Sequence, residues 1–243
     1  MQRPDPRWLR PDWPDVTAFM TTRGPNFGRK AADPAAVRAE RAGLVELLGA
    51  RPIFLDQVHG AEVVRLRADW HDDNAPEADA AVSTDPDLAV AILVADCLPV
   101  LFSAPGAVAG AHAGWRGLAG GVLERTVAAL CDAASCGPQD VRAWLGACIG
   151  PEAFEVGPEV VAAFGREPLP IDQPGFVYRP NPEPRWRANL ALLARERLTS
   201  VNVTRISGGT WCTLTEESSF FSFRGEALGR PRGRMAACIS LRR

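Results

Sequence analysis

Lysine is almost absent from this chain of 243 residues. Among its 27 basic residues Lys30 is the one lysine, and the others are all arginine. An anion site would therefore be built from planar guanidinium groups rather than from ammonium groups. The net charge of -2 gives no electrostatic basis for binding nucleic acid or an anionic membrane surface. No apolar run approaches the roughly 18 residues that a membrane-spanning helix needs.

Histidine is also scarce, because His59, His71 and His112 are the three in the chain. No Cys-x-x-Cys pair, the usual mark of a structural zinc site, occurs among the six cysteines. Residues 1–15 lack the apolar core of a signal peptide, so we expect an extended N-terminal segment and a cytoplasmic protein. In that compartment cysteines act more often as thiols or ligands than as disulfides. Cys131 and Cys136, near the end of a predicted helix, are interpreted as plain thiols.

Short apolar runs rich in β-branched residues occupy the middle of the chain. Residues 88–94, 100–102 and 107–111 are bounded by Pro and Gly, which is typical of buried strands. Cys97 then lies at the mouth of one strand and His112 at the mouth of another. Residues 53–58 predict a further strand that runs directly into His59.

Periodicity and end signals predict the remaining elements. Helices are expected over residues 34–48, 118–134, 158–164 and 186–198, and an irregular loop over residues 165–184. Further strands are expected over residues 16–20, 61–66, 141–149, 203–207, 220–224 and 235–241. No linker or repeat divides the chain. We therefore expect one domain over residues 1–243, of the α/β class in its broad α+β sense, with mixed sheets.

Three potential ligands are expected to meet, because strand ends in such a fold converge on one rim. His59, Cys97 and His112 would offer three N or S ligands with a fourth position open, which is the pattern of a catalytic zinc site. The same residues also suit a cysteine hydrolase or amidase, in which His112 activates Cys97 and Asp96 orients the pair. A third interpretation is a buried cysteine with two ordinary hydrogen-bonded histidines. The pattern alone leaves all three open, and His71 is interpreted as a solvated residue.

A candidate anion site follows His112. The segment Gly114-Trp-Arg-Gly joins a strand end to a helix start, so that backbone amides and the Arg116 guanidinium would suit phosphate. A tight turn with a solvated arginine is the alternative. Arg23 and Arg224, each placed after a predicted strand, are candidates of the same kind or plain surface arginines. Gln57 either points to the rim or lies at a strand edge.

Several segments together resemble the YfiH-like, laccase-domain (polyphenol oxidase) family, whose members are described as multifunctional purine nucleoside phosphorylases. The matching segments are Gln57-Val-His-Gly60, Asp79-Ala-Ala-Val82, Ala95-Asp-Cys-Leu-Pro99, Ala111-His-Ala-Gly-Trp-Arg-Gly117, Gly146-Ala-Cys-Ile-Gly-Pro151, Phe154-Glu-Val156, Phe221-Ser-Phe-Arg224 and Gly233-Arg234. The resemblance implies that His59, Cys97 and His112 bind Zn²⁺. It also implies a sandwich of mixed sheets flanked by helices, related to CNF-type bacterial toxin domains.

The same resemblance implies an enzyme that acts on purine nucleosides and phosphate. The implied reactions are phosphorolysis of adenosine, inosine and S-methyl-5'-thioadenosine, and deamination of adenosine. We assign catalytic roles to Asp96, Arg116 and Glu155, and substrate contacts to Arg23, Gln57, Gly114 and Arg224. We expect a monomer or a weakly associating homodimer.

The laccase label can be weighed against composition. A multicopper oxidase needs about ten or more histidines, because imidazole is a preferred copper ligand, and three histidines cannot hold its centres. Copper can still occupy the zinc site, since it binds N and S ligands more tightly than zinc does. Phenol oxidation at that site is therefore an alternative activity.

Overall fold

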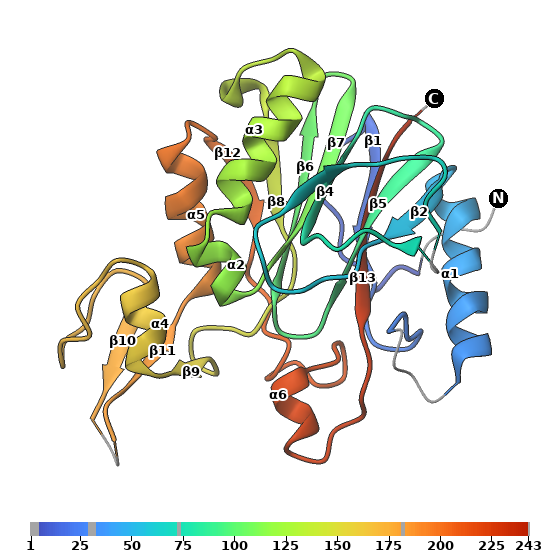
Figure 1. Cartoon of the computed structure of the whole chain (residues 1–243). Helices are drawn as coiled ribbons and strands as arrows, with labels where there is room; N and C mark the ends of the chain where they lie inside the picture. The colour runs from blue at the N-terminus through green and yellow to red at the C-terminus, as the bar shows by residue number, and fades with distance from the viewer. Residues whose placement is uncertain (1–4, 29–32, 72–73, 181–182, 243) are drawn as a thin grey trace.

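Two β-sheets lie face to face at the centre of the protein, and helices cover both outer faces (Figure 1). The computed structural model describes residues 5–28, 33–71, 74–180 and 183–242. Both sheets contain parallel and antiparallel pairs, which confirms the expected class of mixed sheets flanked by helices. No helix within these described ranges is long and apolar enough to cross a membrane.

The larger sheet has six strands in the order β12-β8-β6-β7-β4-β3, and the smaller has four in the order β1-β13-β5-β2. The six strands are β3 (Val63–Arg65), β4 (Ala80–Ser83), β6 (Leu98–Ala104), β7 (Ala107–Ala113), β8 (Arg142–Leu145) and β12 (Arg205–Gly208). The four are β1 (Val16–Met20), β2 (Arg51–Phe54), β5 (Leu88–Val94) and β13 (Met235–Leu241).

The alternation of side chains along each strand divides the core into layers. In β5, Val90 and Ile92 face the other sheet, whereas Ala89 and Ala91 face the helix on the outside. The two sheets approach closely at Gly110 of β7, where a Cβ atom would lie 2.9 Å from the Val90 side chain. Small residues at this crossing therefore set the spacing of the sandwich.

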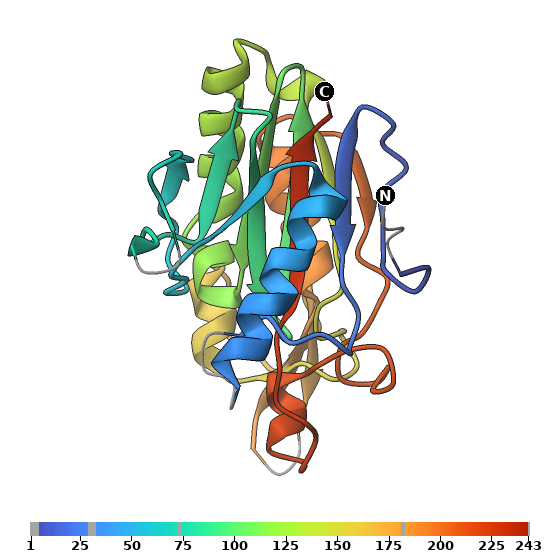
Figure 2. The same cartoon turned by 90° about the vertical axis from the view of Figure 1, so that its right-hand side faces the viewer.

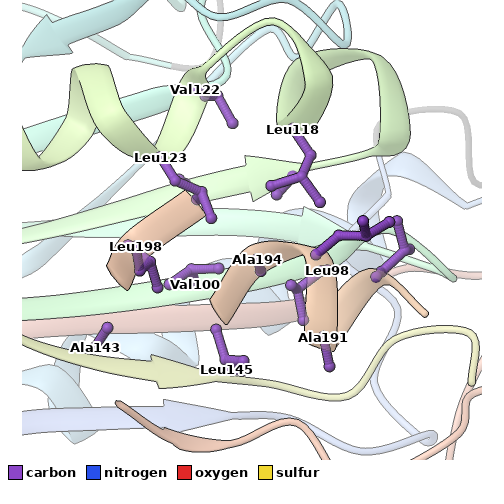
Figure 3. Close-up of a cluster of buried hydrophobic side chains, with 14 of the residues drawn as sticks. Leu98, Val100, Leu118, Val122, Leu123, Ala143, Leu145, Ala191, Ala194 and Leu198 are labelled. Carbon is purple, nitrogen blue, oxygen red and sulfur yellow. The ribbon is translucent and has the colours of Figure 1, made fainter. Parts of the chain in front are cut away.

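Helices α2 (Trp115–Ala119), α3 (Val122–Ala134) and α5 (Leu190–Ser200) cover the outer face of the six-stranded sheet. Figure 3 shows leucine and valine side chains of α2 and α3 pointing toward side chains of β6 and β8, with α5 closing the same cluster. Burial of such side chains contributes about 1.5–3 kcal/mol each. This layer fixes α2, and with it the segment that follows His112.

Helix α1 (Pro34–Leu48) lies across the outer face of the four-stranded sheet (Figure 2). The Asp33 carboxylate accepts hydrogen bonds from the amides of Ala35 and Ala36 at its start. Gly49, with a left-handed φ of 64°, ends it. Both ends lie where the sequence predicts them.

A small three-stranded sheet projects from one end of the sandwich (Figure 1). It consists of β9 (Glu155–Val156), β10 (Phe176–Arg179) and β11 (Arg185–Ala188), and α4 (Pro158–Ala163) lies between the first two. Two predictions are wrong here. Residues 165–184 are not an irregular loop throughout, because β10 lies within them. The helix expected from residue 186 begins after Asn189, whose side chain accepts a hydrogen bond from the Leu192 amide.

Three other predictions need correction. The strand expected over residues 53–58 ends at Phe54, so His59 does not lie at a strand end. The helix expected over residues 118–134 is two helices, because the chain turns at Gly121 with a φ of 87°. The strand expected over residues 220–224 is instead a turn into α6 (Phe223–Glu226), because the Ser222 hydroxyl accepts the Gly225 amide at 3.0 Å.

Candidate metal centre

His59, Cys97 and His112 converge, as the sequence predicts. Their potential ligand atoms all lie within 4.8 Å of one another. His112 is in β7, Cys97 is in the turn that joins β5 to β6, and His59 is in the loop after β2. The two imidazole rings meet edge to face with their centroids 4.8 Å apart. Two nitrogens and one sulfur in this arrangement can hold a metal ion and leave a coordination position open.

Asp79 orients this cluster from behind. Its buried carboxylate accepts a hydrogen bond from Nδ1 of His112 at 2.8 Å. It also accepts the backbone amides of His59 at 2.9 Å and Gly60 at 2.6 Å. His59 has a left-handed φ of 64°, and these bonds hold that unusual conformation. With Nδ1 of His112 engaged by Asp79, Nε2 is the nitrogen left to face a metal ion.

Residue types alone do not predict the role of Asp79, although its segment is part of the family resemblance. The signal in the sequence is a single acidic residue directly before a buried Ala-Ala-Val strand. Such a carboxylate would remain unpaired unless it met a donor, because buried charges need partners. The donors come from segments about twenty and about thirty residues away, which the pattern does not reveal.

The charges of the cluster in the metal-free protein follow from these contacts. Burial alone would raise the pKa of the Cys97 thiol, but hydrogen bonds from His112 and His59 lower it to about 6. Burial alone would lower the pKa of His112, but Asp79 and Cys97 raise it to about 9. At neutral pH the metal-free site therefore pairs a thiolate with an imidazolium. A metal ion binding there must displace the Nε2 proton of His112.

Glycines allow the segment after His112 to touch the cluster. A Cβ atom on Gly114 would lie 3.1 Å from both Sγ of Cys97 and Cδ2 of His59. A Cβ atom on Gly117 would lie 2.5 Å from the carbonyl oxygen of Gly60, so the start of α2 packs directly on the His59 loop. These two positions explain why glycine flanks Trp115 and Arg116.

A cavity of about 860 Å³ opens beside the cluster and is lined by all three of its residues. Arg116, Arg224, Arg232 and Arg234 line it as well, together with the aromatic side chains of Trp115, Phe154 and Phe223. The guanidinium of Arg116 lies 4.3 Å from the centroid of the Trp115 ring, and that of Arg224 lies 5.9 Å from the centroid of Phe154. The cavity thus combines a potential metal ion, cationic groups and flat apolar surfaces.

Asp96 fixes the wall that carries Phe223 and Arg224. Its buried carboxylate accepts the hydroxyls of Thr213 at 2.5 Å and Ser222 at 3.0 Å, and the Arg224 amide at 2.6 Å. The residue itself has a left-handed φ of 83°. We define the arginine wall as residues 222–234. Within it, the Glu226 carboxylate accepts Nε of Arg232 at 2.9 Å and Nη1 of Arg234 at 3.0 Å.

Residues 20–242 match the family described as "Multi-copper polyphenol oxidoreductase laccase". The chain belongs to this family. It is 39% identical to "Purine nucleoside phosphorylase YfiH" of Escherichia coli, over 95% of this chain and 97% of that protein. It is 42% identical to "Purine nucleoside phosphorylase PA4543" of Pseudomonas aeruginosa, over 89% of this chain and 92% of that protein.

Two solved structures have the same fold. The Neisseria meningitidis protein NMB0706 superposes with a TM-score of 0.83 at 36% identity, covering 97% of this chain and 99% of that one. YlmD from Geobacillus stearothermophilus gives a TM-score of 0.85 at 29% identity, covering 100% and 98%. The family description refers to several copper ions. Within the described residues, the three-residue group of His59, Cys97 and His112 is the one cluster suited to a metal ion.

The other predicted site residues divide into two groups. Asp96, Gln57, Gly114, Arg116 and Arg224 all line the cavity. The Gln57 amide is engaged by the backbone of Leu93 through two hydrogen bonds of 2.8 Å, so it ties the His59 loop to β5.

Arg23 and Glu155 are not among the residues that line the cavity. The Arg23 guanidinium donates to the carbonyl oxygen of Glu217 at 2.9 Å, which holds it elsewhere. Glu155 lies on β9 with an exposed side chain, and its backbone carbonyl accepts Nη2 of Arg224 at 3.3 Å. Neither side chain is therefore placed to act on a molecule in the cavity.

Proposed function

We propose that the protein is a zinc-dependent purine nucleoside phosphorylase whose metal ion is held by His59, Cys97 and His112. The observation that carries this proposal is the convergence of these ligands in the lining of a cavity that arginines and aromatic rings also line. The names of the Escherichia coli and Pseudomonas aeruginosa relatives support the reaction class. The donor set supports zinc, because two imidazoles and one thiolate with an open position are typical of catalytic zinc.

The arginines suit the phosphate co-substrate. Arg116 and Arg224 approach the cavity from different elements, and each guanidinium can donate two parallel hydrogen bonds to phosphate oxygens. A purine would lie against the ring of Phe223, Trp115 or Phe154, since flat apolar surfaces of this kind stack on bases. With phosphate at the arginines and the purine against a ring, a phosphate oxygen would form a bond to the anomeric carbon of the nucleoside. The bond from that carbon to the purine nitrogen would break at the same time.

The departing purine takes up a proton in this reaction, and the hydrogen phosphate co-substrate loses one, so the two changes balance. Both carboxylate oxygens of Asp96 already accept hydrogen bonds from Thr213, Ser222 and the Arg224 amide. We therefore assign Asp96 a positioning role rather than that of the acid. A zinc ion bound at the cluster would supply a Lewis acid beside the cavity, which is the chemistry that deamination of adenosine requires.

The test combines metal analysis with product analysis. Elemental analysis of the purified protein should find about one zinc per chain, as expected for a single three-ligand site. Inosine with phosphate should give hypoxanthine and ribose 1-phosphate, and adenosine and S-methyl-5'-thioadenosine should be cleaved in the same way. Release of ammonia from adenosine would measure deamination separately.

A matched pair of variants sharpens this test. His112→Ala should lose both zinc and phosphorolysis. His71→Ala should lose neither, because His71 is exposed and lies outside the cavity lining. Full activity in His112→Ala, or no hypoxanthine from the zinc-loaded protein, would refute the proposal.

Two alternative functions use the same residues, and experiments on the same purified protein distinguish them. The thiolate and imidazolium of the metal-free site favour a cysteine hydrolase or amidase. That enzyme would be inactivated by iodoacetamide even in the presence of zinc. Copper at the site would instead give oxidation of a phenol by the copper-loaded protein that the zinc-loaded protein lacks.

A further inference from the structure

Two cysteines that the proposed function does not use lie together at the end of α3. Cys131 is in the last turn of this helix, and Cys136 follows its end. Figure 1 shows α3 running from α2 toward the end of the sandwich that lies away from α6 and the arginine wall. Neither cysteine lines the cavity.

The way α3 ends brings the two residues into contact. The Cys136 amide donates to the Cys131 carbonyl oxygen at 3.1 Å, and the Ser135 amide donates to that of Asp132 at 3.3 Å. Ser135 has left-handed angles of φ 50° and ψ 46°. This pair of bonds is the Schellman motif, in which the side chains at the positions of Cys131 and Cys136 pack on each other. The contact is usually apolar, and here it joins two thiols.

The thiols face each other across the end of the helix and are partly accessible. Cys136 raises the pKa of the Cys131 thiol, as expected for neighbouring sulfur atoms, and both residues are partly exposed. Cys148 and Cys238, by contrast, are buried. Reagents in solution can therefore reach the pair at the end of α3 without unfolding of the sandwich.

We propose that Cys131 and Cys136 form a redox-active dithiol, a modification site that low-molecular-weight disulfides of the glutathione type oxidise to an intramolecular disulfide. The backbone hydrogen bond already joins the same two residues, so closure needs rotation of side chains rather than formation of a new loop. A disulfide requires Cα atoms about 4.4–6.8 Å apart, and the 3.1 Å hydrogen bond between their backbones holds Cys131 and Cys136 near each other.

The reaction proceeds in two exchange steps. The Cys136 thiolate attacks one sulfur of the small disulfide, whose S–S bond breaks and releases one thiolate that takes up a proton. The Cys131 sulfur then loses its proton and attacks the Cys136 sulfur, which releases the second small thiol. The protein loses two electrons and two protons, and the small disulfide becomes two thiols. Burial and the neighbouring Cys136 raise the pKa of Cys131 to about 11, which supports Cys136 as the sulfur that attacks first.

Tryptic mapping tests the proposal directly, because residues 126–142 form one peptide that contains Cys131, Cys136 and no other cysteine. The folded, metal-loaded protein is equilibrated with reduced and oxidised glutathione in varied ratio and then alkylated. We expect this peptide to lose the mass of two hydrogens and to resist alkylation as the mixture becomes oxidising. The peptide of residues 235–242, which contains the buried Cys238, serves as the internal control and should be fully alkylated once the protein is unfolded.

Single variants test the pairing. In Cys131→Ser, oxidation should stop at one glutathione joined to Cys136, and in Cys136→Ser the remaining Cys131 should react more slowly. On the unmodified chain, phenylarsine oxide should bind residues 126–142 through both sulfurs with loss of one water, which neither variant can do. Two free thiols in a fully oxidising mixture, or two separate glutathione adducts on the peptide, would overturn the proposal.

Discussion

Asp79 and Asp96 are two buried aspartates beside the same cavity, and their hydrogen bonds reach different parts of the chain. Asp79 binds His112 and the amides around His59, so its partners belong to the proposed metal site. Asp96 binds Thr213, Ser222 and the Arg224 amide, more than a hundred residues further along. One carboxylate therefore holds the ligands, and the other holds the arginine wall against them.

This difference divides the site into two halves that should respond separately. The metal half comprises His59, Asp79, Cys97 and His112, and its polar groups are hydrogen-bonded to one another. The arginine wall is a C-terminal segment whose residues Phe223 and Arg224 are exposed. We expect metal affinity to depend on Asp79, and contacts with the nucleoside and phosphate to depend on Asp96.

The largest effect is expected from Asp79→Asn. The asparagine side chain has one acceptor oxygen instead of two, so it cannot accept from the His112 imidazole and from all the backbone amides around His59. Some of these buried donors therefore lose their partner. Zinc affinity should fall by about 10- to 100-fold, as is usual when the partner of a metal-bound histidine is removed. Stability should fall by roughly 2–4 kcal/mol, because buried donors are left unpaired. Competition with a zinc chelator measures the affinity, and urea denaturation measures the free energy of unfolding. Unchanged zinc affinity would contradict the division of the site.

The metal half should also determine how zinc affinity depends on pH. His112 has a pKa raised to about 9 in the metal-free protein, so below that pH a proton must leave Nε2 before zinc can bind. Apparent affinity should therefore rise by up to about tenfold per pH unit from about pH 7 to about pH 9. Zinc titrations at several pH values across this range measure the slope. In Asp79→Asn the rise in affinity should occur at lower pH, because His112 loses the carboxylate that raises its pKa. A flat profile would be inconsistent with the charge of His112.

A smaller and different effect is expected from Asp96→Asn. The substituted side chain keeps one acceptor oxygen but presents an amide nitrogen to the other donors, so the arginine wall loosens and stability falls by about 1–3 kcal/mol. The KM values for phosphate and inosine should rise, whereas zinc affinity should change far less than in Asp79→Asn. Steady-state kinetics measure the KM values, and the same chelator titration measures the zinc affinity. Equal loss of zinc in both variants would show that the two halves are one unit.

The smallest effect is expected from Glu226→Gln. This change breaks the ion pairs with Arg232 and Arg234, whose side chains are 84% and 33% exposed. The Glu226 side chain is 12% exposed, but both partners reach solvent, so the two pairs together contribute about 1 kcal/mol and melting should change little. Zinc content should stay that of the unmodified protein, and the KM for phosphate should rise as two guanidinium groups lose their anchor. A loss of zinc here would contradict the separation of the halves.

The strands at the centre of the fold could be predicted because their sequence pattern is local. Residues 16–20, 88–94 and 235–241 are apolar runs bounded by turn residues, and each is a strand in the structure. The Asp33-Pro34 start and the Gly49 end of α1 were equally local signals. Predictions went wrong where a tertiary hydrogen bond overrides a short apolar run, as at Ser222, which caps α6 and also donates to Asp96.

Residue types and predicted strand ends are enough to select His59, Cys97 and His112 as candidate metal ligands, since the chain has three histidines. The composition likewise implies that any anion would meet arginine rather than lysine. The engagement of His112 by Asp79, and of the C-terminal segment by Asp96, appears in the tertiary structure alone. The same holds for the Arg23 and Glu155 side chains, which lie outside the cavity lining. A buried carboxylate takes its partners from whatever the packed sheets bring within about 3 Å, and no local pattern encodes those long-range contacts.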